Sequence, residues 1–125
     1  MKLLLDSHVL LWWFFDDRRL GAPPRALIAD RDNEIAVSAA STWEISIKRA
    51  LGKLTAPDDL ALQVRAAGFT RWPISLEDGV EAGDLPRHHG DPFDRMLIAQ
   101  AARRGFAVLT SDEAFANYDV ALVRA

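Results

Sequence analysis

Cysteine is absent from this chain of 125 residues, which excludes a disulfide framework and a thiolate metal site. Lysine is scarce, because 12 of the 15 basic residues are arginine, and the formal net charge is −3. This charge argues against a generic, strongly basic nucleic-acid-binding protein but allows local basic patches. The absence of cysteine suits a reducing compartment, and we expect a cytoplasmic protein.

Long apolar runs are absent as well. The apolar segments 3–5 and 9–15 are separated by Asp6 and His8, and neither is long enough to span a membrane. A single lysine precedes them and no small-x-small cleavage site follows promptly, so the pattern is not that of a secretory signal peptide. We therefore expect a mature start at Met1 and no membrane partner.

The remaining composition is that of a globular domain, with 50% hydrophobic and 26% charged residues. A chain of this length usually builds one core, so we predict a single domain over residues 1–125. The aromatic-rich segment 9–15 is interpreted as a core helix, with a protein-contact surface as the alternative.

Short apolar segments alternate with helical patterns along the chain. We predict strands at 2–5, 35–37, 69–74, 106–109 and 120–123. We predict helices from Ser7 to about 15, over 23–29, from Ser38 or Ser41 to about 51, over 55–68, after Ser75, and over 92–104. This alternation predicts an α/β fold, in which helices cover both faces of a parallel sheet.

A carboxylate stands in the predicted apolar stripe of the helix that begins near residue 92. Asp91 is a good N-cap, and Pro92 suits the first helical position. Asp94 then shares a helical stripe with Leu97 and Ile98, which should face the core. A buried carboxylate is costly unless a positive group neutralises it. The sequence therefore predicts a cationic partner for Asp94.

Glu44 presents the same anomaly in the helix that ends near residue 51. The expected apolar stripe around it consists of Ala40, Trp43, Ile47 and Leu51. The alternative is an i,i+4 ion pair with Lys48, which contributes about 0.2–0.5 kcal/mol on an exposed helix. Because an exposed pair belongs on the polar side of a helix, we favour a functional carboxylate.

Four carboxylates are predicted to converge at one edge of the sheet. Asp6 and Asp112 each follow a predicted strand, while Glu44 and Asp94 lie early in helices that should begin at the same edge. Ligands of such sheets bind outside the carboxyl ends of the strands. Clustered oxygen ligands without cysteine favour Mg²⁺ or Mn²⁺ over zinc. Such a metal can polarise a phosphoryl oxygen and activate water for phosphodiester hydrolysis.

The histidines offer an alternative metal site of a different kind. His88 and His89 are neighbours in a loop between Pro86 and Gly90. Adjacent side chains rarely share one ligand geometry, so we interpret both as surface residues.

Four ordered motifs resemble the PIN domain and, more narrowly, the VapC-type toxins of bacterial type II toxin–antitoxin systems. The segments are LLDSH at 4–8, SAASTWEI at 38–45, HGDPFDR at 89–95 and LTSD at 109–112. The resemblance implies a PIN-like three-layer α/β/α fold with a five-stranded parallel sheet and Mg²⁺- or Mn²⁺-dependent endoribonuclease activity on RNA. It also implies a VapB-like antitoxin partner and a homodimer.

The resemblance also implies roles for individual residues. The residues that match the catalytic, metal-binding acids of the family are Asp6, Glu44, Asp94 and Asp112. Ser7 and Ser111 match small hydroxyl positions beside the metal site, and Asp91 belongs to a subfamily form of the third motif. We interpret Asp91 as an N-cap with a supporting role.

Three other classes of protein gather acidic residues at a sheet edge or bind metals. A response-regulator receiver needs a lysine after a late strand, and no lysine follows Lys53. A haloacid-dehalogenase-type phosphatase needs an acidic residue two positions after its first aspartate, where this chain has His8. A non-catalytic metal-binding interaction module stays open as an alternative.

Overall fold

A five-stranded, all-parallel sheet is the middle layer of the computed structural model, which describes residues 1–125. The strand order is β3-β2-β1-β4-β5. The strands are β1 (Lys2–Leu5), β2 (Glu34–Ser38), β3 (Thr70–Trp72), β4 (Ala107–Thr110) and β5 (Leu122–Arg124). The predicted α/β class and the parallel five-stranded sheet are confirmed.

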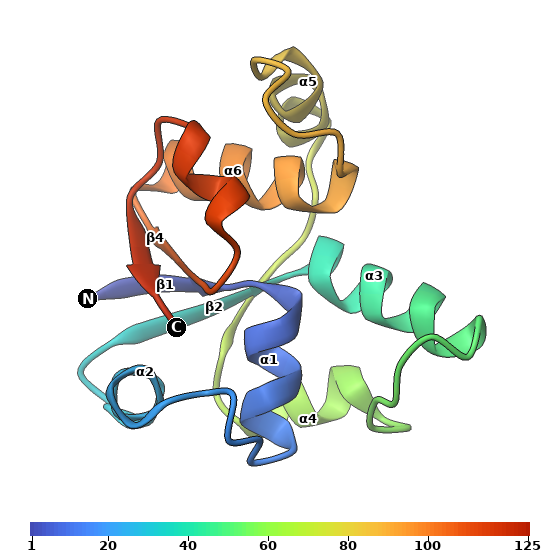
Figure 1. Ribbon diagram of the computed structural model, residues 1–125, viewed down its shortest axis with the longest axis vertical. Coiled ribbons are helices and arrows are strands. Elements are labelled where there is room, and N and C mark those ends of the chain that lie inside the picture. Colours follow the sequence, from blue (N-terminus) through green and yellow to red (C-terminus); the bar gives the residue numbers. More distant parts are fainter.

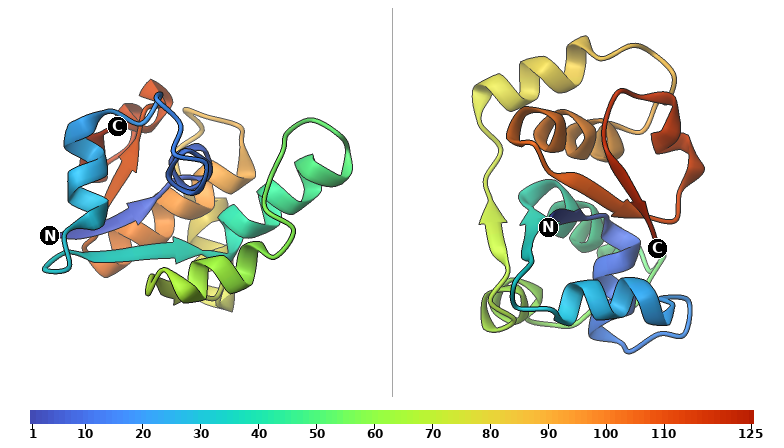
Figure 2. Two further views of the ribbon diagram at one scale, coloured as in Figure 1. Left: turned by 90° about the horizontal axis from the view of Figure 1, so that it is seen from below. Right: turned by 90° about the vertical axis from the view of Figure 1, so that its left-hand side faces the viewer.

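Helices cover both faces of this sheet. They are α1 (Ser7–Phe14), α2 (Ala22–Ala29), α3 (Ala39–Ala50), α4 (Leu60–Ala66), α5 (Leu76–Asp84) and α6 (Pro92–Arg104), with a short 3-10 helix, η1 (Glu113–Asn117). Figure 1 shows α5 and α6 above the sheet and α1, α2 and α4 below it, and Figure 2 shows the same three layers from the side. None of these helices has the length and apolar character that crossing a membrane requires.

The apolar run of β1 is buried because the sheet is covered on both faces. Leu3 and Leu5 point into the core beneath the sheet, where they join Leu10 of α1. Leu4 points the other way and joins Leu97 of α6. Successive residues of one strand therefore hold the two helical layers together.

Helix α6 begins and ends where the sequence predicts. Asp91 Oδ1 accepts hydrogen bonds from the backbone N–H groups of Phe93 at 2.8 Å and Asp94 at 3.1 Å. Pro92 is the first helical residue, and Gly105 ends the helix in the left-handed conformation with φ 71°. The side chains that α6 buries are Leu97, Ile98, Ala99, Gln100 and Ala101. The predicted stripe is confirmed, and it fixes the direction in which Asp94 points.

Two local predictions are wrong. The helix predicted over 55–68 is helical only from Leu60 to Ala66, because the residue before Pro57 is biased away from helical backbone angles. Helix α1 is capped by Asp6, whose Oδ1 accepts the backbone N–H of Val9 at 2.8 Å. Ser7, the predicted cap, is the first residue inside the helix.

The apolar stripe predicted for α3 is also wrong. Trp43 and Leu51 have 60% and 64% of their surface exposed. The residues that α3 buries are Ala40, Ser41, Glu44 and Ile45. Figure 1 shows why: α3 leaves β2 and projects beyond the sheet, so its neighbours α1 and α6 decide which side is buried.

Helix α1 fits the core interpretation only in its first half. Val9, Leu10 and Leu11 are buried, whereas the aromatic residues that follow are half-buried and Phe15 is 48% exposed. The core interpretation therefore holds for residues 9–11, and a protein-contact surface over residues 12–15 stays a prediction.

Candidate active site

The carboxyl edge of the sheet carries all four predicted acids. Asp6 follows β1 directly, and Asp112 lies two residues after β4, where it caps η1. Glu44 lies in the second turn of α3, and Asp94 lies in the first turn of α6. Because β1 and β4 are paired in parallel, their carboxyl ends place Asp6 and Asp112 side by side at this edge.

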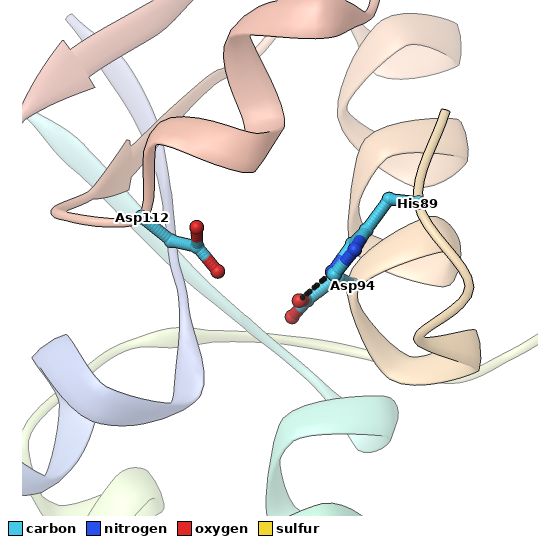
Figure 3. A group of neighbouring side chains, drawn as sticks. All are labelled: His89, Asp94 and Asp112. Carbon is cyan, nitrogen blue, oxygen red and sulfur yellow. Dashed lines mark hydrogen bonds and ion pairs between the residues drawn. The ribbon is translucent and has the colours of Figure 1, made fainter.

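The tightest part of the site consists of His89, Asp94 and Asp112. One ligand atom of each lies within 4.8 Å of the others. Figure 3 shows the Asp112 carboxylate facing the other two across a gap, while His89 and Asp94 are in contact. His89 Nε2 and Asp94 Oδ2 are 2.8 Å apart. The structure thus groups two of the four predicted acids with a histidine.

Asp6 lies beside this group but is held by protein partners. Its side chain accepts hydrogen bonds from the Thr110 hydroxyl and from the backbone N–H of Val9. The same Thr110 oxygen accepts the backbone N–H of Asp112 at 3.0 Å, so one threonine ties the two acids together. Burial raises the pKa of Asp6, and repulsion from Asp112 adds to the rise.

Glu44 is only 4% exposed, and two groups hold it. The Ser7 hydroxyl donates to Oε1 at 2.6 Å, and Lys48 Nζ lies 2.7 Å from Oε2. The hydrogen bond that Lys48 donates to Glu44 raises the pKa of Lys48. Glu44 is therefore buried and forms the ion pair with Lys48, and its functional role stays a prediction. Ser7 therefore contacts Glu44, whereas Ser111 is exposed in a cavity shared with Asp112.

Asp94 is electrostatically strained in the absence of a bound cation. Burial raises its pKa to about 6, with further contributions from the charges of Asp91 and Glu44, while the hydrogen bond with His89 opposes the rise. The same hydrogen bond raises the pKa of His89. His89 is thus the side chain that the structure pairs with Asp94.

The interpretation of both histidines as surface residues is wrong for His89. His88 is exposed, but the side chain of His89 is 26% exposed and directed at Asp94. The place of His89 in the sequence could have predicted this contact. His89 lies two residues before the N-cap Asp91, where a short loop can fold over the start of the helix.

The donor set fits a hard divalent cation. Carboxylate oxygens predominate, sulfur is absent, and mutual repulsion among Asp91, Glu44 and Asp94 is the electrostatic condition that a cation relieves. Asp94 and Asp112 could hold such an ion directly, since their oxygens already lie close together. Asp6 and Glu44 flank that position.

Comparison with known proteins identifies the family of this chain. Residues 3–121 match the model of the PIN domain family. The chain belongs to the PIN domain family. Ribonuclease VapC22 of Mycobacterium tuberculosis is 35% identical over 118 residues, which cover 88% of this chain and 86% of that protein. This identity places the chain among the VapC-type PIN domains.

Solved structures confirm the PIN fold. VapBC2 from Rickettsia felis, bound to promoter DNA, matches with a TM-score of 0.68 at 13% identity and covers 100% of this chain and 99% of that chain. A toxin–antitoxin complex from Klebsiella pneumoniae matches with a TM-score of 0.67 at 17% identity, over 97% and 95% of the two chains. FitAcB from Neisseria gonorrhoeae matches with a TM-score of 0.63 at 19% identity, over 96% and 95%.

Replacing Lys48 with methionine is expected to destabilise this PIN domain in the absence of metal. Glu44, with 5% of its side chain exposed, would lose its counter-ion, but Lys48 is itself 36% exposed, so solvent screening limits the effect. We expect a loss of about 1 kcal/mol in the free energy of unfolding, measured by urea denaturation in a chelator. Lys53→Met, which removes an exposed lysine without an ion pair, is the control. Equal stabilities of the two variants would contradict this role of Lys48.

Proposed function

We propose that this PIN domain is the toxin of a toxin–antitoxin pair and cleaves RNA internally with Mg²⁺ or Mn²⁺ at the carboxyl edge of its sheet. The observation that carries the proposal is the group of His89, Asp94 and Asp112, in which oppositely placed elements aim ligand atoms at one point. The relative named Ribonuclease VapC22 supports RNA as the substrate. The place of action would be the cytoplasm.

The proposed role of each acid follows from the contacts of its side chain. Asp94 and Asp112 hold the metal, and Asp6 and Glu44 complete the anionic rim of the site. Ser7 orients Glu44 by its 2.6 Å hydrogen bond, and Asp91 supports Asp94 by capping α6. A bound Mg²⁺ or Mn²⁺ supplies Lewis-acid polarisation of the phosphate and activation of water.

The proposal is tested with a circular single-stranded RNA, which only an internal cut can open. Purified protein with Mg²⁺ should linearise it, and Asp94→Asn protein purified in the same way is the control for contaminating nucleases. An intact circle after prolonged incubation with RNAs of varied sequence would favour the non-catalytic metal-binding module instead.

Partners are the second part of the proposal. The structural neighbours from Rickettsia felis and Klebsiella pneumoniae are toxin–antitoxin complexes, which supports a VapB-like antitoxin for this chain. Exposed Phe15 and half-buried Trp12 and Trp13 provide aromatic surface at the end of α1, which suits an amphipathic partner helix. A short protein encoded beside this one should bind it and inhibit cleavage, whereas failure to co-purify would contradict this part.

Self-association is expected through α5. Leu76 and Val80, one helical turn apart, are 87% and 65% exposed, more than core-forming side chains of a monomer usually are. We expect a homodimer at roughly tens of micromolar in light scattering, where an ordinary dimer persists. Val80→Glu should yield a monomer, while Leu51→Glu, at the exposed C-cap position that follows α3, should not. A monomeric wild type would contradict the dimer, and a dimeric Val80→Glu variant would contradict its location.

A further inference from the structure

A basic cavity adjoins the acidic site on the side of His89. Its volume is about 330 Å³, and its lining consists of Gly83, Arg87, His88, His89, Gly90 and Arg95. No carboxylate and no large apolar side chain lines it. His89 is shared between the two sites, because its Nε2 atom contacts Asp94 while the residue lines the cavity. One imidazole ring therefore separates the cavity from the acids.

Arg95 gives the cavity a fixed and uncompensated positive charge. Its guanidinium donates hydrogen bonds to the carbonyl oxygens of Ala82, Leu85 and Pro86, each at 2.9 Å. Weaker contacts reach the Gly83 and His89 carbonyls and the Tyr118 hydroxyl. All of these acceptors are neutral, so the hydrogen bonds hold the guanidinium in place without cancelling its charge.

The loop that carries the other basic residues is held in place as well. The backbone N–H of His89 donates to the Tyr118 hydroxyl at 2.8 Å, and the His88 ring packs edge-on against the Tyr118 ring. Arg87, on the same loop, is exposed and forms no ion pair or hydrogen bond within the chain. The cavity thus has a rigid, charged wall and one arginine free to bind a ligand.

The neighbouring cavities differ in charge or in position. On the opposite side of Asp112, a cavity of about 480 Å³ contains Arg124, but Glu113 neutralises that arginine at 2.7 Å. A third cavity, of about 460 Å³, contains Arg65 and Arg71 but none of the site's acids. Of these three cavities, the one beside His89 combines uncompensated positive charge with direct contact to the acidic group.

We propose that this cavity binds an RNA backbone phosphate adjacent to the phosphodiester that lies at the acids: Arg87, whose donors are free, contacts the phosphate oxygens, and Arg95, whose Nη1 and Nη2 atoms are held by protein oxygens, contributes its positive charge. The proposal rests on the proposed ribonuclease function. When one phosphate of a single-stranded RNA lies at the acidic group, its neighbouring phosphates must lie close to the surrounding surface. A free guanidinium suits such a phosphate, because its planar pair of N–H donors matches two phosphate oxygens.

Arg87→Gln is the test, with Arg31→Gln as its matched control. Arg31 is an exposed arginine that forms no ion pair and lies in another cavity, between α2 and β2, at the amino end of the strands. Cleavage of a single-stranded RNA oligonucleotide is followed at several salt concentrations in Mg²⁺. For Arg87→Gln we expect KM to rise about tenfold with kcat nearly unchanged, as for the loss of one charge-assisted contact. The dependence of log KM on log salt should weaken by about 0.7, the contribution of one phosphate in a single strand.

Neutral methylphosphonate linkages locate the contact on the RNA. A methylphosphonate next to the cleavage site should raise KM for the wild-type protein and for Arg31→Gln, but should have little further effect on Arg87→Gln, because both changes remove the same contact. Independent, multiplicative effects of the two changes would overturn the proposal.

Two further outcomes separate this proposal from its alternatives. If the wild type cleaves RNA while Arg87→Gln and Arg31→Gln have the same KM and salt dependence, the phosphate site is overturned and the ribonuclease function stands. If Arg87→Gln weakens only antitoxin binding, the cavity takes an acidic protein segment and the RNA proposal is overturned. A wild type that cleaves no RNA would overturn the proposed function and, with it, this site.

Discussion

Asp94→Asn is expected to abolish RNA cleavage while leaving the metal-free protein folded and at least as stable as the wild type. The carboxylate lies in the tightest group of potential ligands, so its loss should reduce the cleavage rate by about a thousandfold or more, equivalent to several kcal/mol of transition-state stabilisation. Burial and the charges of Asp91 and Glu44 oppose ionisation of Asp94, and asparagine removes that cost.

Asp91→Asn is the matched control for this variant. Asparagine caps a helix about as well as aspartate does, so the hydrogen bonds to Phe93 and Asp94 should persist. We expect folded protein and a much smaller loss of activity. Equal losses of activity in the two variants would contradict the assignment of metal binding to Asp94 and helix capping to Asp91.

The pH dependence of stability gives an independent test of the environment of Asp94. Its pKa is raised from 3.8 to about 6, so its protonated form is favoured in the folded state. The stability that this shift contributes is fully present below the unfolded pKa and is lost as the pH rises through the folded pKa. Between about pH 4 and pH 7, the wild type in a chelator should lose on the order of 2 kcal/mol relative to Asp94→Asn. Parallel pH profiles of the two proteins in urea denaturation would contradict the raised pKa.

Removing divalent metal is expected to eliminate cleavage, and Mg²⁺ or Mn²⁺ should restore it. The oxygen-rich ligand group motivates this prediction, and Ca²⁺ should fail to restore activity because its larger, looser coordination shell positions water poorly. Initial rates in a chelator, followed by addition of each metal at constant ionic strength, give the measurement. We expect the chelated protein to be at least a thousandfold slower, a loss of roughly 4 kcal/mol of transition-state stabilisation.

The control for metal removal is a measurement of whether the protein stays folded in the chelator. Both cores lie within a covered sheet and contain none of the acids, so the circular dichroism spectrum should be unchanged by the chelator. Full activity in scrupulously metal-free protein would refute the metal requirement. Loss of structure in the chelator would mean that the ion has a structural role.

Some features were predictable because short-range chemistry decides them. The continuous apolar segment Leu3–Leu5 suits only a strand covered on both faces, and it is β1 in the structure. Asp91 and Pro92 specify a helix start by their own backbone and side-chain geometry, so the first turn of α6 and the position of Asp94 followed directly. The helix start predicted at Ser75 is confirmed, and the capping box that Ser75 forms with Asp78 is local in the same sense.

Other features depend on residues far apart in the sequence, and patterns within one helix could not provide them. Trp43 fits an apolar stripe on α3, yet it is exposed, because α3 projects beyond the sheet and packs against α1 and α6. The contact of Ser7 with Glu44 joins α1 to α3 across 37 positions, and the Thr110 hydroxyl that holds Asp6 comes from 104 positions away.

The sequence by itself determined the α/β class, the start of α6 and the set of acids at one edge of the sheet, since hydrophobic periodicity and helix capping act over a few residues. Only the tertiary structure decided how those acids are held. It placed His89 against Asp94, brought Ser7 into contact with Glu44 and tied Asp6 to Asp112 through Thr110. The physical reason is that desolvation and charge pairing depend on which elements pack together. Those elements come into contact only when the helices pack on both faces of the sheet.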